Sequence, residues 1–152
     1  MQLLGTGFYW DELEVGAQYQ TYGRTITETD LINFVTGTGM LESLFLDAEY
    51  RKRHSAMDGQ AAPALLVLSF AEGLVLNCTG QATGLAFLNM EMDVKLPVFV
   101  GDTIHVEIEV SEARKTSKSD RGLVKTRNRI VNQRGETVIE YSPQRLMEGR
   151  AG

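Results

Sequence analysis

The feature that most constrains this chain is a run of almost uninterrupted apolar residues between Pro63 and about residue 78. Proline suits the first position of a helix, and only Ser69, Glu72 and Asn77 interrupt the apolar residues that follow it. A helix that is apolar on nearly every side must be covered on nearly every side. The sequence therefore predicts a central helix over about 63–78 that the rest of the fold encloses.

Alternating apolar and polar residues predict the strands that enclose this helix. The predicted strands cover residues 18–26, 85–95, 102–111, 121–131 and 136–146. Since these strands mostly follow one another through turns, we expect an α+β fold in which a curved antiparallel sheet of about five strands wraps around the helix. A chain of 152 residues is the size of one domain, so a single domain is expected over residues 1–152.

Two shorter helices have recognisable first turns. Thr27 and Asp30 are spaced as a capping box, with Asp in place of the usual Glu or Gln, and predict a helix that begins after Thr27. Asp47 is a suitable N-cap for a second helix that ends at about His54. We therefore expect both helices to lie between the first strand and the central helix.

Polar residues of the central helix allow more than one interpretation. Glu72 is either a buried acid at an interface or a side chain that is paired or hydrated, and the second is favoured because an unpaired buried carboxylate is costly. Ser69 is expected to bond to its own helix rather than to act as a nucleophile. Cys78 is expected to be a packed, inert thiol at the end of the helix.

Composition excludes several classes of function. The chain has 15 basic and 20 acidic residues and a net charge of −5, and this sign disfavours binding to a phosphate backbone. One cysteine and two histidines exclude a disulfide framework and a metal centre built from several such ligands. No secretory signal and no apolar run long enough for a bilayer are visible. We expect a cytoplasmic protein that binds no nucleic acid, membrane or metal.

Two of the predicted strands carry charges of opposite sign on their outward faces. Glu107 and Glu109 lie on one strand, and Lys125, Arg127 and Arg129 lie on its expected neighbour. The favoured interpretation is ion pairing between strands on a solvated surface. A nucleic-acid patch is the weaker alternative, since the chain is acidic overall and no aromatic residues alternate with these cations.

Four segments stand in a recognisable order along the chain: Trp10–Gly16, Gly23–Asp30, Pro97–Thr103 and Val131–Glu136. In this order, and from about residue 8 to 146, the chain resembles the MaoC-like acyl dehydratases, which are hot-dog proteins related to (R)-specific enoyl-CoA hydratases. The resemblance implies a hot-dog fold and a dimer, possibly a higher oligomer, with acyl-thioester pockets near the interface. It implies no cofactor apart from coenzyme A as part of the substrate.

The same resemblance implies a reaction, the reversible addition of water across the 2,3 bond of an enoyl-CoA. Active members take an aspartate and a histidine from an Asp-x-Asn-Pro-x-His segment after the first helix. In this chain the aligned positions hold Met40 and Phe45, and Glu42 stands at the position of the asparagine. No aspartate or histidine occurs between residues 40 and 46. The acid/base pair of the family is therefore missing.

Glu42 is the leading candidate to replace that pair. It stands between Met40 and Phe45, which are expected to line an acyl pocket, and burial among such residues would suit an acid/base group. The alternative is a partly exposed loop residue, which is the commoner situation for glutamate. Asp58, in the loop before the central helix, is a weaker candidate, because such residues usually form turns or caps.

Other residues are expected to bind the substrate. The backbone N–H groups of Ala64 and Leu65 begin the central helix and would hold the thioester oxygen, unless water or a side chain caps them. Gln60 lies in the preceding loop. Arg51 and Arg53 could bind the phosphates of coenzyme A, although cations at the end of a helix are also favoured by its dipole alone.

Three functions stay open at this point. The first is a hydratase or dehydratase with a non-standard acid/base set centred on Glu42. The second is a non-catalytic binder of acyl-CoA or of an acyl-carrier thioester, or the inactive partner of a catalytic subunit. The third is an acyl-CoA thioesterase, since one scaffold can support several chemistries.

Overall fold

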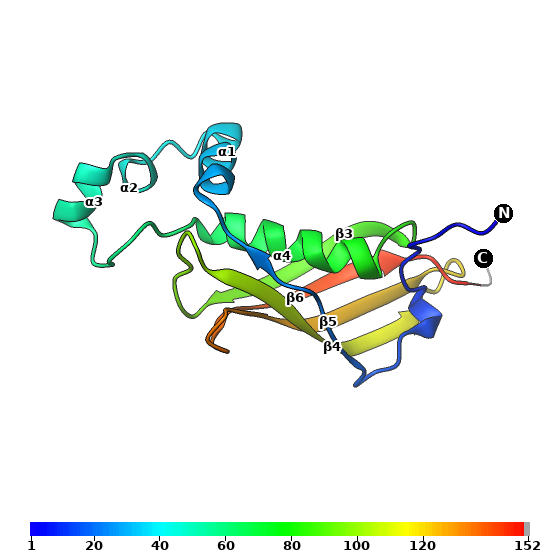
Figure 1. Ribbon diagram of the computed structural model, residues 1–152. Helices are drawn as coiled ribbons and strands as arrows, with labels where there is room; N and C mark the ends of the chain where they lie inside the picture. The colour runs from blue at the N-terminus through cyan, green and yellow to red at the C-terminus, as the bar shows by residue number, and fades with distance from the viewer. Residues whose placement is uncertain (151–152) are drawn as a thin grey trace.

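The computed structural model describes residues 1–150, in which one long helix lies against an antiparallel sheet (Figure 1). The helices are the short 3-10 helix η1 (Trp10–Glu12), α1 (Glu28–Thr38), α2 (Ser43–Leu46), α3 (Ala48–His54) and α4 (Ala64–Thr79). The strands are β1 (Gln18–Gln20), β2 (Arg24–Thr25), β3 (Gly84–Val94), β4 (Thr103–Lys115), β5 (Gly122–Val131) and β6 (Thr137–Met147). The expected α+β class is confirmed, and η1 and α2 are the helices that the sequence did not predict.

The sheet has six strands where about five were expected. Its order is β1-β4-β5-β6-β3, all antiparallel, and β2 pairs separately with β4. The predicted first strand is divided after Gln20. The Thr21 N–H still donates to the Val106 carbonyl over 2.9 Å, but the Val106 N–H donates to the Thr21 hydroxyl over 3.0 Å. The longest strands, β3 to β6, form the platform on which α4 lies.

The helix α4 packs on one face of this platform (Figure 1). Its buried side chains are Leu66, Val67, Leu68, Ala71 and Val75. The expectation that this helix is covered on nearly every side is wrong for the single chain, since Leu65 and Leu76 are 49% and 38% exposed. The expected packed thiol of Cys78 is exposed as well. The sheet curves around one side of the helix only, and no other element of residues 1–150 encloses the opposite side.

A mostly buried ion pair fastens α4 to the sheet. One guanidinium nitrogen of Arg145, on β6, lies 2.6 Å and 2.5 Å from the two carboxylate oxygens of Glu72. The two side chains are only 13% and 16% exposed. The prediction that Glu72 is paired or hydrated, rather than an unpaired buried acid, is confirmed.

The first turns of the short helices follow from their sequences. The Asp30 N–H donates to the Thr27 hydroxyl over 3.1 Å, and the Thr27 N–H donates back to the Asp30 carboxylate over 2.9 Å. The carboxylate of Asp47 accepts the N–H groups of Glu49 and Tyr50 at the start of α3. Both predicted caps are therefore confirmed. In the described part of the chain, no helix has the length and apolar character needed to cross a membrane.

The capping box predicts a pH-dependent contribution of α1 to stability. The hydrogen bond from the Thr27 N–H, more than the nearby Arg24 charge, lowers the pKa of Asp30 below its usual value. A lowered pKa contributes stability above the unfolded-state pKa, about 3.9, and loses it as the pH falls through the folded-state value. Asp30→Asn should lower the free energy of unfolding by about 1 kcal/mol at pH 7. In urea titrations this difference from wild type should shrink below about pH 4, whereas the control Glu28→Gln should change little.

The ion pair predicts an asymmetry between single and double variants. Glu72→Leu leaves the Arg145 charge without its partner in a mostly buried site, and should lower the free energy of unfolding by about 3 kcal/mol. The double variant Glu72→Leu/Arg145→Met should recover most of this loss, because both charges leave together. Glu107→Gln, which removes a surface pair, should cost less than about 1 kcal/mol. Equal stability of the single and double variants in urea unfolding would contradict this account.

Candidate functional site

The segment that leads into α4 is fixed by backbone pairing with the loop before β4. The Ala62 N–H donates to the Val98 carbonyl over 2.7 Å, and the Val100 N–H donates to the Gln60 carbonyl over 2.9 Å. Gln60 itself is half-buried beside this pairing. The first turn of α4 is therefore held at a defined place relative to the sheet.

The first backbone amides of α4 are free donors. Pro63 is the N-cap and provides no side-chain cap. Within residues 1–150 the N–H groups of Ala64 and Leu65 have no hydrogen-bond partner. They lie at the positive end of a 16-residue helix, where a partly negative oxygen is stabilised. The structure thus places Gln60 in the segment that leads into Ala64 and Leu65, and their role in binding stays a prediction.

A buried carboxylate holds the loop that positions these amides. Asp102 is 7% exposed and accepts hydrogen bonds from the Phe99 N–H at 2.9 Å and from the Gln133 amide at 2.7 Å. Its own carbonyl accepts the N–H of Ile26. Asp102 therefore joins the turn between β5 and β6, the start of α1 and the loop that pairs with the segment leading into α4. Asp102 lies in the segment Pro97–Thr103, whose sequence alone does not indicate this role.

The positions that the resemblance aligned with an acid/base pair hold apolar side chains that pack against the core. Met40 and Phe45 are both half-buried and pack against the main hydrophobic cluster. Phe45 lies in α2, and its N–H donates to the Glu42 carbonyl over 3.0 Å. The side chains at these two positions therefore contribute packing and no proton transfer.

The candidate acids lie at the surface of the single chain. Glu42 is exposed at the N-cap of α2, where its side chain accepts no capping hydrogen bond. Asp58 is exposed in the loop before α4. That loop turns where the Ser55 hydroxyl accepts the Met57 N–H at 3.1 Å. The chain alone therefore supplies neither candidate with apolar surroundings.

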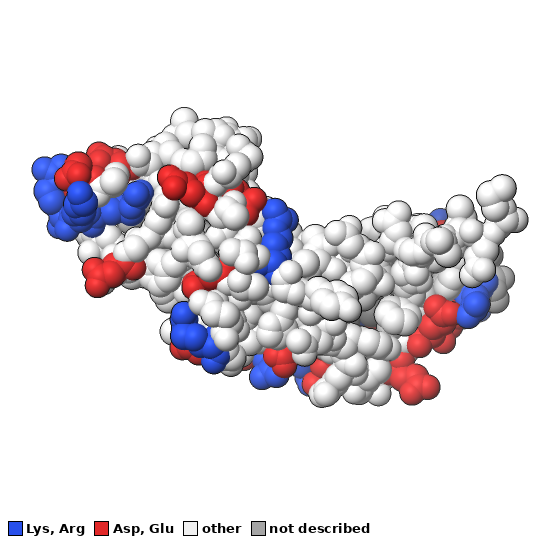
Figure 2. Space-filling view, viewed as in Figure 1, with Lys and Arg blue, Asp and Glu red and all other residues white. Residues whose placement is uncertain are grey.

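The basic residues Arg51, Lys52 and Arg53 lie on α3. We call α2 and α3 together the arm, because they extend beyond the sheet (Figure 1). Figure 1 shows α2 and α3 at the far end of the molecule from the chain termini, and Figure 2 shows Lys and Arg gathered there. The Arg51 guanidinium donates to the Leu44 carbonyl over 3.1 Å, so it fastens α3 to α2. Arg53 is exposed and remains accessible to a ligand, although its Nε contacts the Glu49 carbonyl at 3.3 Å.

The uncovered side of α4 continues into an exposed apolar strand. The large apolar side chains of β3 that are at least 41% exposed are Leu85, Phe87, Leu88 and Val94. Because β3 is the edge strand next to β6, one row of its backbone N–H and C=O groups has no strand partner in the described chain. We call Leu65 and Leu76 of α4, together with these β3 side chains, the open apolar face. Such a face is typical of an interface.

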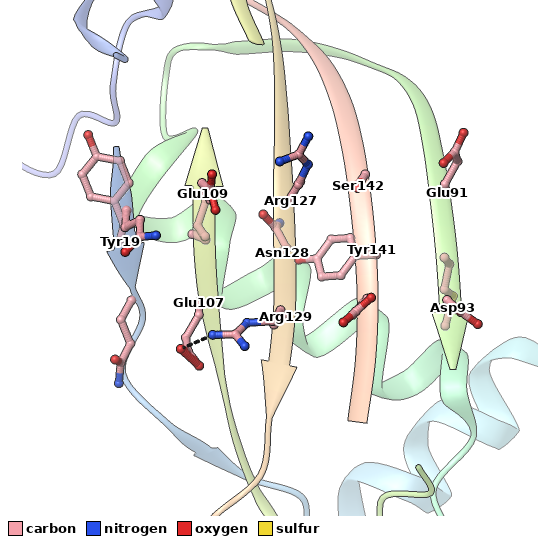
Figure 3. Close-up of a pocket in the computed structure, with 15 residues that line it drawn as sticks. Tyr19, Glu91, Asp93, Glu107, Glu109, Arg127, Asn128, Arg129, Tyr141 and Ser142 are labelled. Carbon is pink, nitrogen blue, oxygen red and sulfur yellow. Dashed lines mark hydrogen bonds and ion pairs between the residues drawn. The ribbon is translucent and has the colours of Figure 1, made fainter. Parts of the chain in front are cut away.

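The opposite face of the sheet is a polar groove of about 860 Å³ (Figure 3). Two rows of side chains cross it, and each has an arginine on the middle strand: Arg129 lies between Glu107 and Glu140, and Arg127 lies between Glu109 and Ser142. Arg129 is 2.9 Å from Glu107. The expected cross-strand pairing is confirmed for this pair, and the face has the character of a solvated surface.

Beneath α4, the inner face of the sheet carries polar side chains that the sequence analysis missed. Asn128 and Tyr141 lie opposite each other on β5 and β6 and are each 2% exposed. Burial, followed by the nearby Glu72 charge, raises the pKa of Tyr141 well above its usual value. The alternation around Asn128, between exposed Arg127 and Arg129, was a signal that its side chain points inward.

Known proteins resemble the chain over nearly its whole length. The model of the FAS1-like dehydratase domain region matches residues 14–141. A MaoC-like dehydratase from Rhodospirillum rubrum is 25% identical, with a TM-score of 0.83 over 95% of this chain and 99% of that one. The R-hydratase PhaJ1 from Pseudomonas aeruginosa is 26% identical, with a TM-score of 0.78 over 95% and 88%. No curated protein sequence matches the chain.

A further structure establishes the fold. RV0216 from Mycobacterium tuberculosis, described as a double hotdog fold, is 21% identical with a TM-score of 0.81, over 94% of this chain and 44% of that one. A sheet that curves around one long helix is therefore one hot-dog unit, as the resemblance implied. With the family model matching most of its length, the chain belongs to the FAS1-like dehydratase domain family and to the MaoC-like hot-dog proteins.

Proposed function

We propose that this protein binds acyl thioesters, most directly acyl-CoA, and lacks its own acid/base pair for hydration. The observation that carries the proposal is a combination: the amides of Ala64 and Leu65 are free, whereas the positions aligned with the family's acid/base pair hold the apolar residues Met40 and Phe45. Binding machinery is retained where proton-transfer machinery is replaced. In this role the protein is a carrier of the thioester or the non-catalytic partner of a catalytic subunit.

The amides would recognise the thioester carbonyl. Two N–H donors at a helix N-terminus stabilise an oxygen that carries partial negative charge, and they are already oriented before the ligand arrives. The exposed guanidinium of Arg53 would contribute to binding of the coenzyme A phosphates, since such groups favour Arg. Arg51 contributes less, because it is already bonded to the Leu44 carbonyl.

A second copy of the chain would complete the molecule. The open apolar face leaves large side chains in water, and the unpaired edge of β3 is suited to antiparallel pairing with another β3. The double hotdog fold of RV0216 supports two such units side by side. We therefore propose a homodimer that buries this face.

A hydratase centred on Glu42 is the second candidate function. The observation that favours it is the presence of exposed apolar side chains near Glu42 in the sequence, since Leu41 and Leu46 are 63% and 44% exposed. If a second copy covers these side chains, it would also shield Glu42 from water. Acid/base chemistry would then depend on the dimer.

Substitution of the first amide tests the proposed binding mode. Ala64→Pro removes one N–H donor, while proline is tolerated at the first position of a helix and Pro63 already has compatible backbone angles, φ −54° and ψ 138°. Calorimetry should show saturable binding of acyl-CoA by wild type. The loss of one hydrogen bond should weaken this binding roughly threefold to tenfold. Ala64→Ser, which keeps the N–H, is the matched control and should bind normally.

The same incubations distinguish the functions by mass spectrometry of the products. Wild type with enoyl-, hydroxyacyl- and saturated acyl-CoA should return each ligand unchanged. Interconversion of enoyl- and hydroxyacyl-CoA that Glu42→Gln abolishes would establish the hydratase instead. Release of free coenzyme A would establish a thioesterase. Absence of any binding would refute the proposal.

Charge on the edge strand tests the proposed dimer. Phe87→Glu places a carboxylate in the centre of the open apolar face, so the protein should become monomeric at concentrations where wild type is dimeric. Light scattering after size-exclusion chromatography measures this change. Val15→Glu, at another exposed apolar residue outside the face, should leave the dimer intact. A wild-type monomer, or a dimer in the Phe87→Glu variant, would contradict the assignment.

A further inference from the structure

The interior beneath α4 contains polar atoms whose bonding the described chain does not satisfy. Both amide atoms of the Asn128 side chain and the hydroxyl of Tyr141 are buried without a hydrogen-bond partner in residues 1–150. Figure 3 shows the two side chains next to each other on neighbouring strands. Unsatisfied buried groups are rare and each needs an explanation. If Asn128 and Tyr141 only filled space, apolar side chains of similar shape would do so without leaving polar atoms unsatisfied.

These atoms are grouped with the ion pair that fastens α4 to the sheet. We call Glu72, Asn128, Tyr141 and Arg145 the inner polar cluster. Glu72 and Arg145 neutralise each other, so the cluster has no net charge. On its outer side the Arg145 guanidinium lies 5.4 Å from the ring centre of Phe87, on the open apolar face. The cluster therefore extends from the uncovered side of α4 into the interior.

A small cavity adjoins the cluster. Its volume is about 40 Å³, and Arg145 forms part of its wall. Thr126 and Pro143 also line it, and each lies two residues along the strand from Asn128 or Tyr141, on the same face of the sheet. Its walls are mostly apolar, and a cavity of this size accommodates about one water-sized group of atoms. The interior therefore has a small space next to Arg145, which Asn128 and Tyr141 adjoin along their strands but do not line.

The position of the cluster along α4 relates it to the thioester site. Ala64 and Glu72 are eight residues apart, which corresponds to about 12 Å along the helix. In the proposed function the thioester oxygen is held at Ala64, so an acyl group that follows α4 brings its distal part to Glu72. This step rests on the proposed function.

We propose that the inner polar cluster recognises a neutral oxygen, a hydroxyl or a ketone, on the distal part of the bound acyl group. The Asn128 amide nitrogen and the Tyr141 hydroxyl supply donors, and the Asn128 amide oxygen supplies an acceptor. An acyl group without such an oxygen leaves these atoms unsatisfied. An acyl carboxylate is disfavoured, since Glu72 already neutralises Arg145 and an added charge has no counterion.

The test compares matched ligands on the intact protein. Calorimetry measures the affinity for saturated acyl-CoAs from hexanoyl- to tetradecanoyl-CoA. It also measures the affinity for acyl-CoAs of each length that carry a hydroxyl, or a carboxylate, at the distal end of the acyl chain. Wild type should bind the best hydroxylated ligand roughly fivefold to tenfold more tightly than the saturated one of that length. The dicarboxylic ligand should bind less tightly than the hydroxylated one.

Tyr141→Phe and Asn128→Leu should each abolish this preference, whereas Tyr22→Phe, at an exposed tyrosine, should keep it. Tyr141→Phe removes a hydroxyl that is unpartnered in the free protein, so its thermal unfolding should show no loss of stability. Equal affinity for saturated and hydroxylated ligands in wild type, or a preference that survives Tyr141→Phe, would overturn this inference while the proposed function stands. If no acyl-CoA binds, the proposed function fails and the inference fails with it.

Discussion

The structure depends on the burial of one side of α4 against the inner face of the sheet. Leu66, Ala71 and Val75 fill that contact, and the Glu72–Arg145 pair determines where along β6 the helix rests. This packing also determines the direction of the first turn of α4, because the loop before β4 pairs with the residues that precede it. The free amides are therefore a consequence of how the core is assembled.

Local signals predicted local structure well. The caps at Thr27 and Asp47 involve residues two or three positions apart, so a short stretch of sequence contains both partners. The alternating strands were predicted for the same reason. The prediction that α4 is covered on nearly every side was wrong for the single chain. An apolar surface indicates that something covers it, but it does not indicate whether the covering residues belong to the same chain. The sequence predicts one enclosed helix, whereas the single chain leaves Leu65 and Leu76 of that helix exposed.

In the candidate site, too, local features could be predicted from the sequence and contacts between distant segments could not. The start of the central helix at Ala64 was predicted because a helix start is visible in sequence. That Met40 and Phe45 replace an acid/base pair is an inference from alignment with the family and stays a prediction. The inner polar cluster was missed, since Asn128 and Tyr141 meet only through the register of two strands. Such a contact has no signature within either strand alone. Polar residues at inward positions of alternating strands deserve inspection for this reason.

The buried carboxylate of Asp102 ties distant parts of the chain into one mechanical unit. Through Gln133 on one side and Phe99 on the other, the tip of the β5–β6 hairpin is linked to the segment that aims the first amides of α4. Lengthening or regrafting that hairpin tip would thus change the geometry around the first amides of α4 from a distant part of the sequence. Substitutions in the turn between β5 and β6 could therefore alter the start of α4 through Asp102.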